Sequence, residues 1–266
     1  MIQQCPVCNI VAKEYLYVKS RQRHIMKCTN PLCTLQFVSR IPTAAELREL
    51  YQKHYYNESE RSDYCDTDPV LARQYLSSIK ENIGDLAGKS MLDVGCGRGS
   101  VLTIAKEFGL SISGVEPYAA VQAHIPQALN GTIYNDLDDV IHANQGYDLI
   151  TLIEVIEHIV EPWKILRRLC DIMHKNSHMY IQTPNVDSLR CVFQRSDWPN
   201  YVNPTHLYFF NEKSLLMVMR KAGINNVTRL HVPVSYPEHN IARRSIQRIL
   251  QHCNLDGSLK LLGSVT

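Results

Sequence analysis

The sequence predicts an α/β protein in which a mostly parallel sheet, covered by helices on both faces, follows a small cysteine-rich module. Three observations predict it. From Lys89 onward, strand-like apolar runs alternate with helix-like segments. A glycine-rich turn at 95–99 joins the first of these strands to a helix. Two pairs of cysteines lie within the first forty residues. A chain of 266 residues is long enough for one such domain and a small appendage.

Composition excludes few classes of function. The net charge of +2 and the pI near 8.0 are nearly balanced, so they argue neither for nor against a nucleic-acid partner. No apolar run reaches the roughly 18 residues that span a bilayer. The first residues form no basic and apolar leader, and the chain has nine cysteines. We therefore expect a cytoplasmic protein with reduced thiols, in which metal binding is favoured over disulfides.

The first predicted unit, residues 1–42, carries Cys5 and Cys8 as one pair and Cys28 and Cys33 as the other. Strand-like runs lie between and after the pairs, at 14–18, 24–27 and 35–38. Two short cysteine pairs separated by a hairpin match a tetrahedral zinc site with four thiolate ligands. The metal would supply folding free energy that so small a core lacks. The alternative is four unrelated buried cysteines. The module resembles a zinc ribbon.

Some polar and aromatic side chains of this module are candidates for nucleic-acid contacts. They are Tyr15, Lys19, Arg21, Arg23 and His24. We interpret them as a solvated face of the ribbon instead.

Residues 43–88 are predicted to form a helical linker and lid. Thr43 and Glu46 have the spacing of a capping box, which predicts a helix over 43–56. The polar segment 57–68 is interpreted as a linker or lid. Pro69 begins a second predicted helix, 69–86. Its expected apolar face consists of Val70, Leu71, Tyr75, Leu76, Ile79 and Ile83.

Residues 89–266 are predicted to form the sheet domain. Strands are expected at 90–94, 111–115, 132–134, 147–153, 178–182 and 226–232. Helices are expected at 100–108, 119–129, 162–173, 212–222 and 241–253. A seventh strand is expected at 261–266. Because the chain stops within that strand, the natural protein is expected to extend past Thr266.

The turn after the first sheet strand is built to hold a polar ligand against bare backbone. Glycines tolerate positive φ and close approach of a ligand, and a helix N-terminus presents unpaired N–H groups. Gly95, Gly97 and Gly99 follow Asp93, whose carboxylate repels a pyrophosphate but suits a cationic amino-acid group. The segment Leu-Asp-Val-Gly-Cys-Gly-x-Gly resembles the S-adenosylmethionine (SAM) site of class I methyltransferases.

Two later strand ends extend this candidate cofactor site. Glu116 closes the second strand, about twenty residues beyond the glycine loop, where a carboxylate can accept hydrogen bonds from both ribose hydroxyls. Its alternative is a solvated loop carboxylate. The resemblance further implies that Asp136 accepts the adenine amino group and that Leu137 offers a backbone N–H.

The segment after the fourth strand carries Glu154, Glu157 and His158, where ligands of open α/β sheets bind. If it turned helical, the three side chains would share a face. This segment, together with 182–185 and 204–210, resembles the ubiquinone-biosynthesis type of O-methyltransferases. The resemblance covers roughly 75–235. It implies a Rossmann-like seven-stranded methyltransferase sheet with an antiparallel last strand, and it places Glu154 beside the cofactor.

Three roles stay open for His158. It suits a general base near neutral pH for a hydroxyl acceptor. Alternatively, the pattern resembles small-RNA 2′-O-methyltransferases, which implies a divalent cation (Mg²⁺ or Mn²⁺) held by Glu154, Glu157 and His158, with His206 as a further ligand. The third role is structural: Glu157 and His158 orient the following turn.

The long irregular section after the fifth strand is expected to contact the acceptor, because such loops over strand ends carry substrate contacts. Trp198 and Tyr201 would be flat walls for a sugar or aromatic ring. The alternative is a packed loop.

These features predict a SAM-dependent methyltransferase acting on O, N or C of a small acceptor such as a sugar, nucleotide-sugar, quinol-like compound or secondary metabolite. Sugar C-methyltransferases also carry an N-terminal zinc module. The second hypothesis is an RNA methyltransferase that recognises RNA through the module. The near-neutral charge speaks against it. A third is an interaction protein with a vestigial SAM site, against which the intact glycine loop, Asp93 and Glu116 argue.

Overall fold

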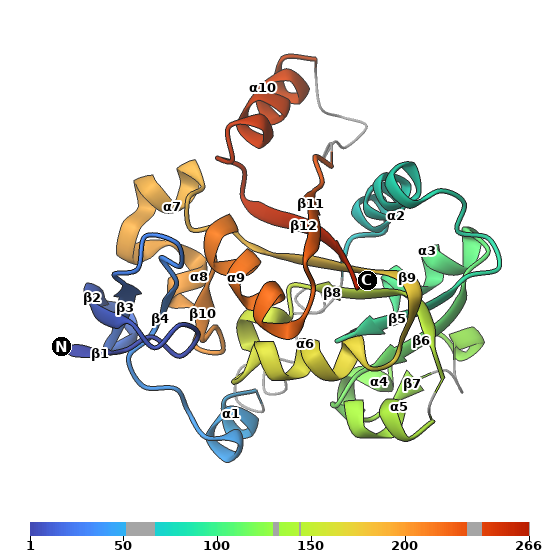
Figure 1. Ribbon diagram of the computed structural model, residues 1–266, viewed down its shortest axis with the longest axis horizontal. Helices are drawn as coiled ribbons and strands as arrows, with labels where there is room; N and C mark the ends of the chain where they lie inside the picture. The colour runs from blue at the N-terminus through green and yellow to red at the C-terminus, as the bar shows by residue number, and fades with distance from the viewer. Residues whose placement is uncertain (52–66, 130–132, 144, 233–240, 266) are drawn as a thin grey trace.

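Two β-sheets, one at each end of the molecule, organise the computed structural model (Figure 1). The structure describes residues 1–51, 67–129, 133–143, 145–232 and 241–265. The larger sheet has seven strands in the order β11-β12-β9-β8-β5-β6-β7. The smaller has five, in the order β1-β2-β3-β4-β10. Within the described residues, no helix has the length and apolar character that crossing a bilayer requires.

The seven-stranded sheet confirms the predicted fold. Its strands are β5 (Ser90–Val94), β6 (Ser111–Val115), β7 (Ile133–Tyr134), β8 (Tyr147–Ile153), β9 (Met173–Pro184), β11 (Asn226–Arg229) and β12 (Ser258–Ser264). β7, β6, β5, β8 and β9 are parallel neighbours. β12 inserts antiparallel between β9 and β11. The strand order reverses beside β5, so the carboxyl ends of β5 and β8 open into the crevice where such sheets bind ligands.

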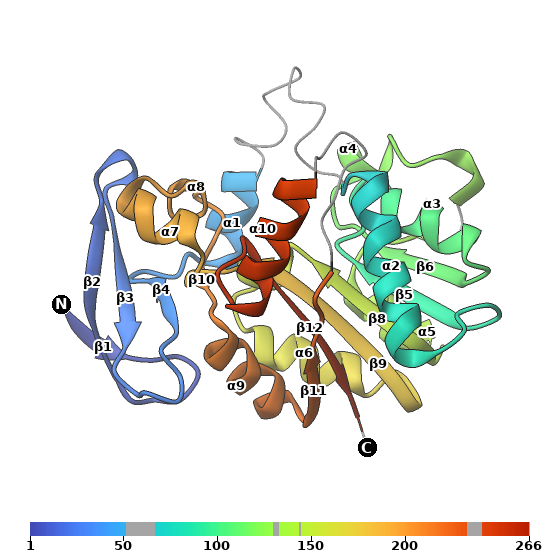
Figure 2. The same cartoon turned by 90° about the horizontal axis from the view of Figure 1, so that it is seen from above.

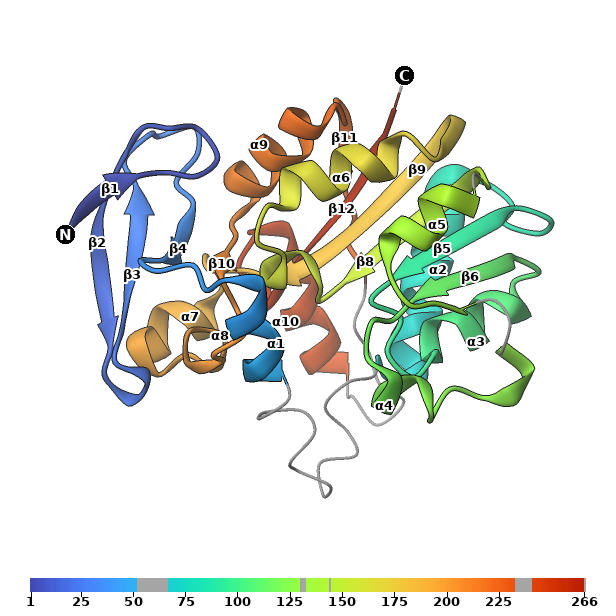
Figure 3. The ribbon, with the colours of Figure 1, turned by 90° about the horizontal axis from the view of Figure 1, so that it is seen from below.

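Helices cover both faces of this sheet (Figure 3). The helices are α2 (Pro69–Ile83), α3 (Ser100–Glu107), α4 (Ala119–Gln122), α5 (Leu137–Ala143), α6 (Pro162–Cys170) and α9 (Glu212–Ala222). A further helix, α10 (Ile241–His252), precedes β12 and leaves Ile246 and Ile249 exposed. Successive strand residues point to opposite faces, so β8 sends Leu149 into the core under α2 and α3 and Ile150 into the core under α6 and α9.

Some predicted boundaries were wrong. The expected helix 119–129 is interrupted, with α4 ending at Gln122 and a 3-10 turn at Gln127–Leu129, because Pro126 lacks an N–H and clashes with a continuing helix. β9 begins at Met173 rather than His178, since its exposed residues 174–176 hide the strand pattern. Val70 is 39% exposed and does not belong to the buried face of α2.

The smaller sheet contains the strands of the cysteine module and one strand from much later in the chain. Its strands are β1 (Ile2–Gln4), β2 (Val11–Val18), β3 (Arg23–Cys28), β4 (Gln36–Val38) and β10 (Tyr208–Phe209). A 3-10 turn, Lys19–Arg21, joins β2 to β3. Figure 2 shows this sheet beside α7 (Leu189–Gln194) and α8 (Pro199–Val202). One apolar core runs from Cys5 through Phe209 to Leu215 of α9.

The segment between the sheets begins with α1 (Ala44–Tyr51). Thr43 and Glu46 form the predicted capping box, with Thr43 N donating to Glu46 Oε2 at 2.8 Å and Glu46 N donating to Thr43 Oγ1 at 3.3 Å. Residues 52–66, which include most of the expected linker or lid, lie outside the described part of the chain.

Candidate active site

A cavity of about 830 Å³ lies at the carboxyl ends of the parallel strands. Of the residues predicted to form the site, those in its wall are Asp93, Gly95, Gly97, Glu116, Asp136, Leu137, Glu154, His158 and His206. Gly99 and Glu157 were also predicted to belong to the site but do not line the cavity. Sequence reasoning missed Tyr51, Tyr75, Asn200 and Asn203, which also line the cavity. A polar side chain by itself does not indicate that a residue lines a cavity, so the sequence offered no way to identify these four.

The glycine loop needs its glycines for space and conformation. Gly95 has φ +72°, and a Cβ there would lie 2.5 Å from Val155 Cγ2. Its N–H donates to Val115 O at 2.8 Å, which holds the loop against β6. Gly99, with φ +86°, is the N-cap of α3. The loop therefore presents backbone and the start of a helix to the cavity.

Glu116 closes this loop from the neighbouring strand. Its Oε2 accepts a hydrogen bond from Gly97 N at 3.2 Å, and its Oε1 accepts one from Tyr118 N at 3.0 Å. Burial raises the pKa of this carboxyl to about 7, against the lowering effect of the two N–H donors. A further donor arriving from the cavity would favour the ionised form.

Two aspartates frame the same wall. Asp93 is 3% exposed, and its Oδ1 accepts a hydrogen bond from Thr151 Oγ1 at 2.5 Å, its partner across the β5–β8 pair. Asp136 caps α5, where its Oδ1 accepts from Asp139 N at 2.8 Å. Leu137 is the first residue of that helix.

The segment after β8 does not form the helix on which a shared face depended. Glu154 has φ +55°, and only Ile156–His158 make a 3-10 turn. Gln182 Nε2 donates to Glu154 Oε1 at 3.3 Å. Glu157 is 1% exposed; its Oε2 accepts from Thr183 Oγ1 at 3.0 Å, while its Oε1 has no donor among the described residues. Burial and the neighbouring Glu154 charge raise the pKa of Glu157 well above its usual range.

Two imidazoles meet at the far side of the cavity. The rings of His158 and His206 stand edge to face, with centroids 4.5 Å apart. His158 Nδ1 lies 3.1 Å from Thr205 O. A carbonyl oxygen only accepts, so Nδ1 carries the proton and Nε2 keeps its lone pair. Burial lowers the pKa of His158 to about 4 and that of His206 well below its usual range, so both rings are neutral at pH 7.

Beside these two imidazoles lies a group of side chains that could together bind a metal ion. Ligand atoms of Glu157, His158 and His206 all lie within 4.8 Å of one another. Glu154 is not a member of this group, in contrast to the set expected from the sequence. His206 Nδ1 is buried without a hydrogen-bond partner in the described part of the chain.

The irregular section after β9 corrects one expectation. Trp198 and Tyr201 are 2% and 1% exposed, and their rings pack edge to face with centroids 4.9 Å apart. Tyr201 Oη donates to Gln36 of β4. These aromatics are therefore core residues that fix the loop, and the loop shows Asn200 and Asn203 to the cavity instead.

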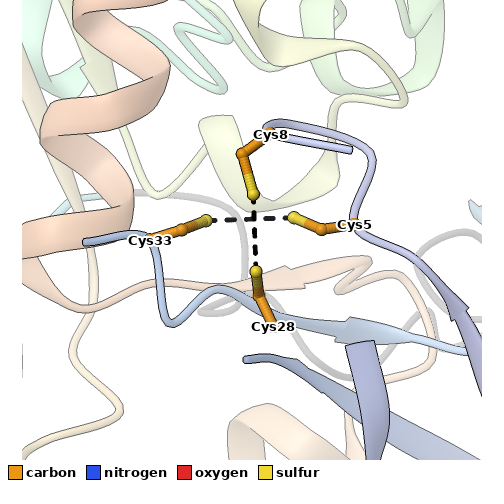
Figure 4. A group of neighbouring side chains, drawn as sticks. All are labelled: Cys5, Cys8, Cys28 and Cys33. Carbon is orange, nitrogen blue, oxygen red and sulfur yellow. Dashed lines mark hydrogen bonds between the residues drawn. The ribbon is translucent and has the colours of Figure 1, made fainter. Parts of the chain in front are cut away.

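The four cysteines of the module converge on one point (Figure 4). Cys5 Sγ lies 3.8 Å from Cys33 Sγ, and Cys8 Sγ lies 3.4 Å from Cys28 Sγ. A tetrahedron with Zn–S bonds of about 2.3 Å places its sulfurs about 3.8 Å apart, so the spacing fits zinc. Hydrogen bonding from Cys33 lowers the pKa of Cys5 to about 5, while burial raises that of Cys28 to about 12.

The strand order, the glycine loop and the cavity define a class of enzyme, the SAM-dependent methyltransferases of the Rossmann-like, class I fold. The methyltransferase domain family matches residues 69–229, well over half of the chain, and the protein belongs to this family.

Curated relatives include ubiquinone biosynthesis O-methyltransferases. That of Cronobacter sakazakii is 29% identical over 119 residues, which cover 41% of this chain and 48% of the relative. That of Pseudomonas savastanoi pv. phaseolicola is 26% identical over 148 residues, which cover 53% of this chain and 62% of the relative. The chain thus spans about half to three-fifths of the length of these relatives.

Solved structures share the fold. A SAM-dependent methyltransferase from Archaeoglobus fulgidus superposes with a TM-score of 0.55 at 17% identity, covering 79% of this chain and 99% of that one. The 1,6-didemethyltoxoflavin-N1-methyltransferase of Burkholderia thailandensis, solved with S-adenosylhomocysteine, gives 0.60 at 14% identity, covering 96% and 100%.

Proposed function

We propose that this enzyme transfers the methyl group of SAM to a small acceptor, held between the glycine loop and the two histidines. The observation that carries the proposal is the cavity in which Asp93, Glu116 and His158 share a wall. Among acceptor atoms we favour an oxygen, because a neutral imidazole in the cavity suits removal of a hydroxyl proton and the curated relatives are named O-methyltransferases.

The proposal assigns each cofactor contact to a residue of the cavity wall or of the glycine loop beside it. The backbone at Gly95 and Gly97 and the carboxylate of Asp93 receive the methionine end, whose ammonium group complements a carboxylate. Glu116 accepts from the ribose hydroxyls, Asp136 accepts from the adenine amino group, and Leu137 N donates to the adenine ring. Gly99 starts α3, which directs its positive end at the same region. Glu154 supplies a second carboxylate beside the methionine end.

SAM supplies an activated methyl group, so the protein's contribution is positioning, desolvation and proton removal. His158 Nε2 accepts the proton of the acceptor hydroxyl as the new O–CH3 bond forms and the S–CH3 bond breaks. Thr205 O holds Nδ1–H of His158 and thereby fixes the basic tautomer. The ring of His206 stands edge to face against that of His158.

A second role for this corner rests on a specific observation. Glu157 Oε1 and His206 Nδ1 are buried without a partner among the described residues, and with His158 they form a compact ligand set. A divalent cation bound there would orient the acceptor oxygen. Titration of metal-free enzyme with Mn²⁺, followed by electron paramagnetic resonance, separates the two roles. Loss of free Mn²⁺ signal with one equivalent supports the metal, and an unchanged signal supports the base alone.

The cysteine module is proposed to hold structural zinc through Cys5, Cys8, Cys28 and Cys33. RNA recognition through this module is the weaker alternative, because Arg21 and Arg23 donate to backbone carbonyls of the 200–206 loop instead of facing a phosphate backbone.

The test is calorimetric titration with S-adenosylhomocysteine. The wild-type chain should bind it, and Asp93→Ala should abolish binding. Asp171→Asn, at an exposed position after α6, is the matched control and should bind like wild type. Retained affinity in Asp93→Ala refutes the cofactor site. A SAM-consumption screen over candidate hydroxyl acceptors then identifies the substrate.

A further inference from the structure

Arg23 reaches from the cysteine module into the loop that forms the acceptor side of the cavity. Its Nη1 donates to His206 O at 3.3 Å, and its Nη2 donates to Tyr201 O and, at 3.5 Å, to Asn200 O. The guanidinium carbon also lies 5.6 Å from the centre of the Phe209 ring. One side chain thus holds three carbonyls of a loop that carries three residues of the cavity wall.

Two of the three carbonyls that Arg23 holds belong to residues that line the cavity, and the third belongs to the core residue Tyr201. Asn200, Asn203 and His206 line the cavity, while Arg23 grips the backbone of the first and the last of them. Arg21 adds a hydrogen bond from Nε to Val202 O at 2.8 Å, between these positions. The planar fork of an arginine can hold several acceptors at fixed angles, which a lysine cannot.

β3 connects this clamp to the cysteine cluster. Arg23 is its first residue and Cys28 its last, and β2 and β4 pair with it on either side. β4 continues the connection, because Val38 N donates to Leu207 O at 3.0 Å and Leu207 N donates to Glu157 O at 2.9 Å. Backbone hydrogen bonds, in addition to the Arg23 guanidinium, therefore join the module to the part of the cavity wall that carries His158 and His206.

We infer that Arg23 is a positioning residue for the acceptor side of the site, and that the cysteine module serves the reaction by holding the 200–206 loop in place. The inference rests on the proposed function, since it assigns acceptor binding to the cavity wall at Asn200, Asn203 and His206. It gives the module a role that requires no nucleic-acid partner.

The experiment follows the loop directly, in a Trp163→Phe background that leaves Trp198 as the sole tryptophan. In Arg23→Gln we expect amide hydrogen exchange of residues 200–203 and 205–207 to accelerate by at least about tenfold, the effect of losing even one of the three charge-assisted hydrogen bonds that Arg23 donates. Acrylamide quenching of Trp198 should rise in parallel. The affinity for S-adenosylhomocysteine should stay within twofold, because Arg23 does not line the cofactor side.

Lys13→Gln, which removes an exposed charge from β2 of the same sheet, is the matched control and should leave all three readouts unchanged. The inference would be overturned if Arg23→Gln showed the same loop hydrogen exchange and the same Trp198 quenching as the wild type. Metal content verifies that the module stays folded. If Arg23→Gln loses its metal, the Arg23→Lys variant is measured instead. Faster hydrogen exchange of the 200–206 loop with the metal retained supports the positioning role of Arg23. Hydrogen exchange at the wild-type rate overturns it. Failure of the proposed function shows separately, as absence of S-adenosylhomocysteine binding in the wild type.

Discussion

At the scale of single residues, burial sets the chemistry of the site. Glu116 and His158 both line the cavity, and in both the protein disfavours the charged form. For the carboxyl this places the pKa at about 7, within reach of ordinary buffers. For the imidazole it leaves the neutral, basic form in place throughout the neutral range.

Glu116 predicts a pH-dependent affinity for the cofactor. In the proposed site the ribose hydroxyls would donate to the ionised carboxyl, and the raised pKa means that Glu116 holds a proton below about pH 7. Affinity for S-adenosylhomocysteine should therefore rise as pH increases from 6 to 8, by roughly tenfold for one proton. Calorimetry at both pH values measures it. Glu116→Gln should bind weakly with a flat profile, and an equally flat wild-type profile would contradict the assignment.

His158 predicts a selective loss of turnover. His158→Gln should lower kcat by about 10²–10⁴, the typical contribution of a general base, while S-adenosylhomocysteine affinity stays near wild type. Because its pKa is lowered to about 4, wild-type kcat at saturating SAM should not fall between pH 8 and pH 6. The exposed His174→Gln is the control. Full activity in His158→Gln would exclude both its catalytic roles.

At the scale of elements, the two cysteine-bearing loops and β3 form one unit. Cys5 and Cys8 lie between β1 and β2, and Cys28 and Cys33 flank the turn before β4. The four sulfurs meet without forming disulfides among the described cysteines. Ligand thiolates held at tetrahedral spacing bind zinc, and the binding free energy becomes folding free energy of the strands that carry them.

The module therefore predicts metal loss from a single conservative change. Cys28→Ser should lose its zinc, measured by elemental analysis of the purified protein, and should lower the thermal midpoint. Cys253→Ser, at an exposed cysteine after α10, should keep one zinc per chain and the wild-type midpoint. Equal zinc content in the two variants would mean that the cluster is not the metal site.

At the scale of the whole molecule, the two sheets are not independent. β10 lies 170 residues after β4 in the chain and still pairs with it, with Tyr208 opposite Phe37. Asn211 Nδ2 also donates to Thr34 Oγ1 at 2.9 Å. A shared apolar core continues across this junction. Loss of order in the smaller sheet therefore exposes core surface of the larger one.

This continuity predicts one cooperative thermal transition. Circular dichroism and tryptophan fluorescence should give the same midpoint, because Trp163 and Trp198 both contact the shared core. Removing zinc with a chelator should shift both signals together to a lower temperature. Two separated transitions would show that the module unfolds on its own.

Much of the cofactor side could be predicted because its signals are local in sequence. Asp93, Gly95 and Glu116 lie at the ends of two adjacent strands, and the alternation of strands and helices predicts that these ends meet. The two cysteine pairs are likewise visible in the sequence, because the spacing within each pair is a local pattern. The broken helix at Pro126 was also readable from the sequence, although the predicted range ignored it.

The acceptor side was not predictable in the same way. Trp198 and Tyr201 had the composition of a ligand wall but are buried, and Asn200 and Asn203 face the cavity through the conformation of one short loop. Glu157 and His206 are 49 residues apart in number; only the resemblance to small-RNA 2′-O-methyltransferases put them in one ligand set, and in the structure Leu207 N donates to Glu157 O beside them. No local pattern encodes such contacts.

The sequence by itself therefore determined the sheet, the glycine loop and the paired spacing of the cysteines, since each depends on periodicity or on neighbours along the chain. Only the tertiary structure decided that Arg23 and Arg21 donate to backbone carbonyls of the 200–206 loop. It also decided that the cysteine module shares one apolar core with the segments that carry His158 and His206. The physical reason is that burial and hydrogen bonding between distant segments depend on how the two sheets pack, which sequence spacing does not record.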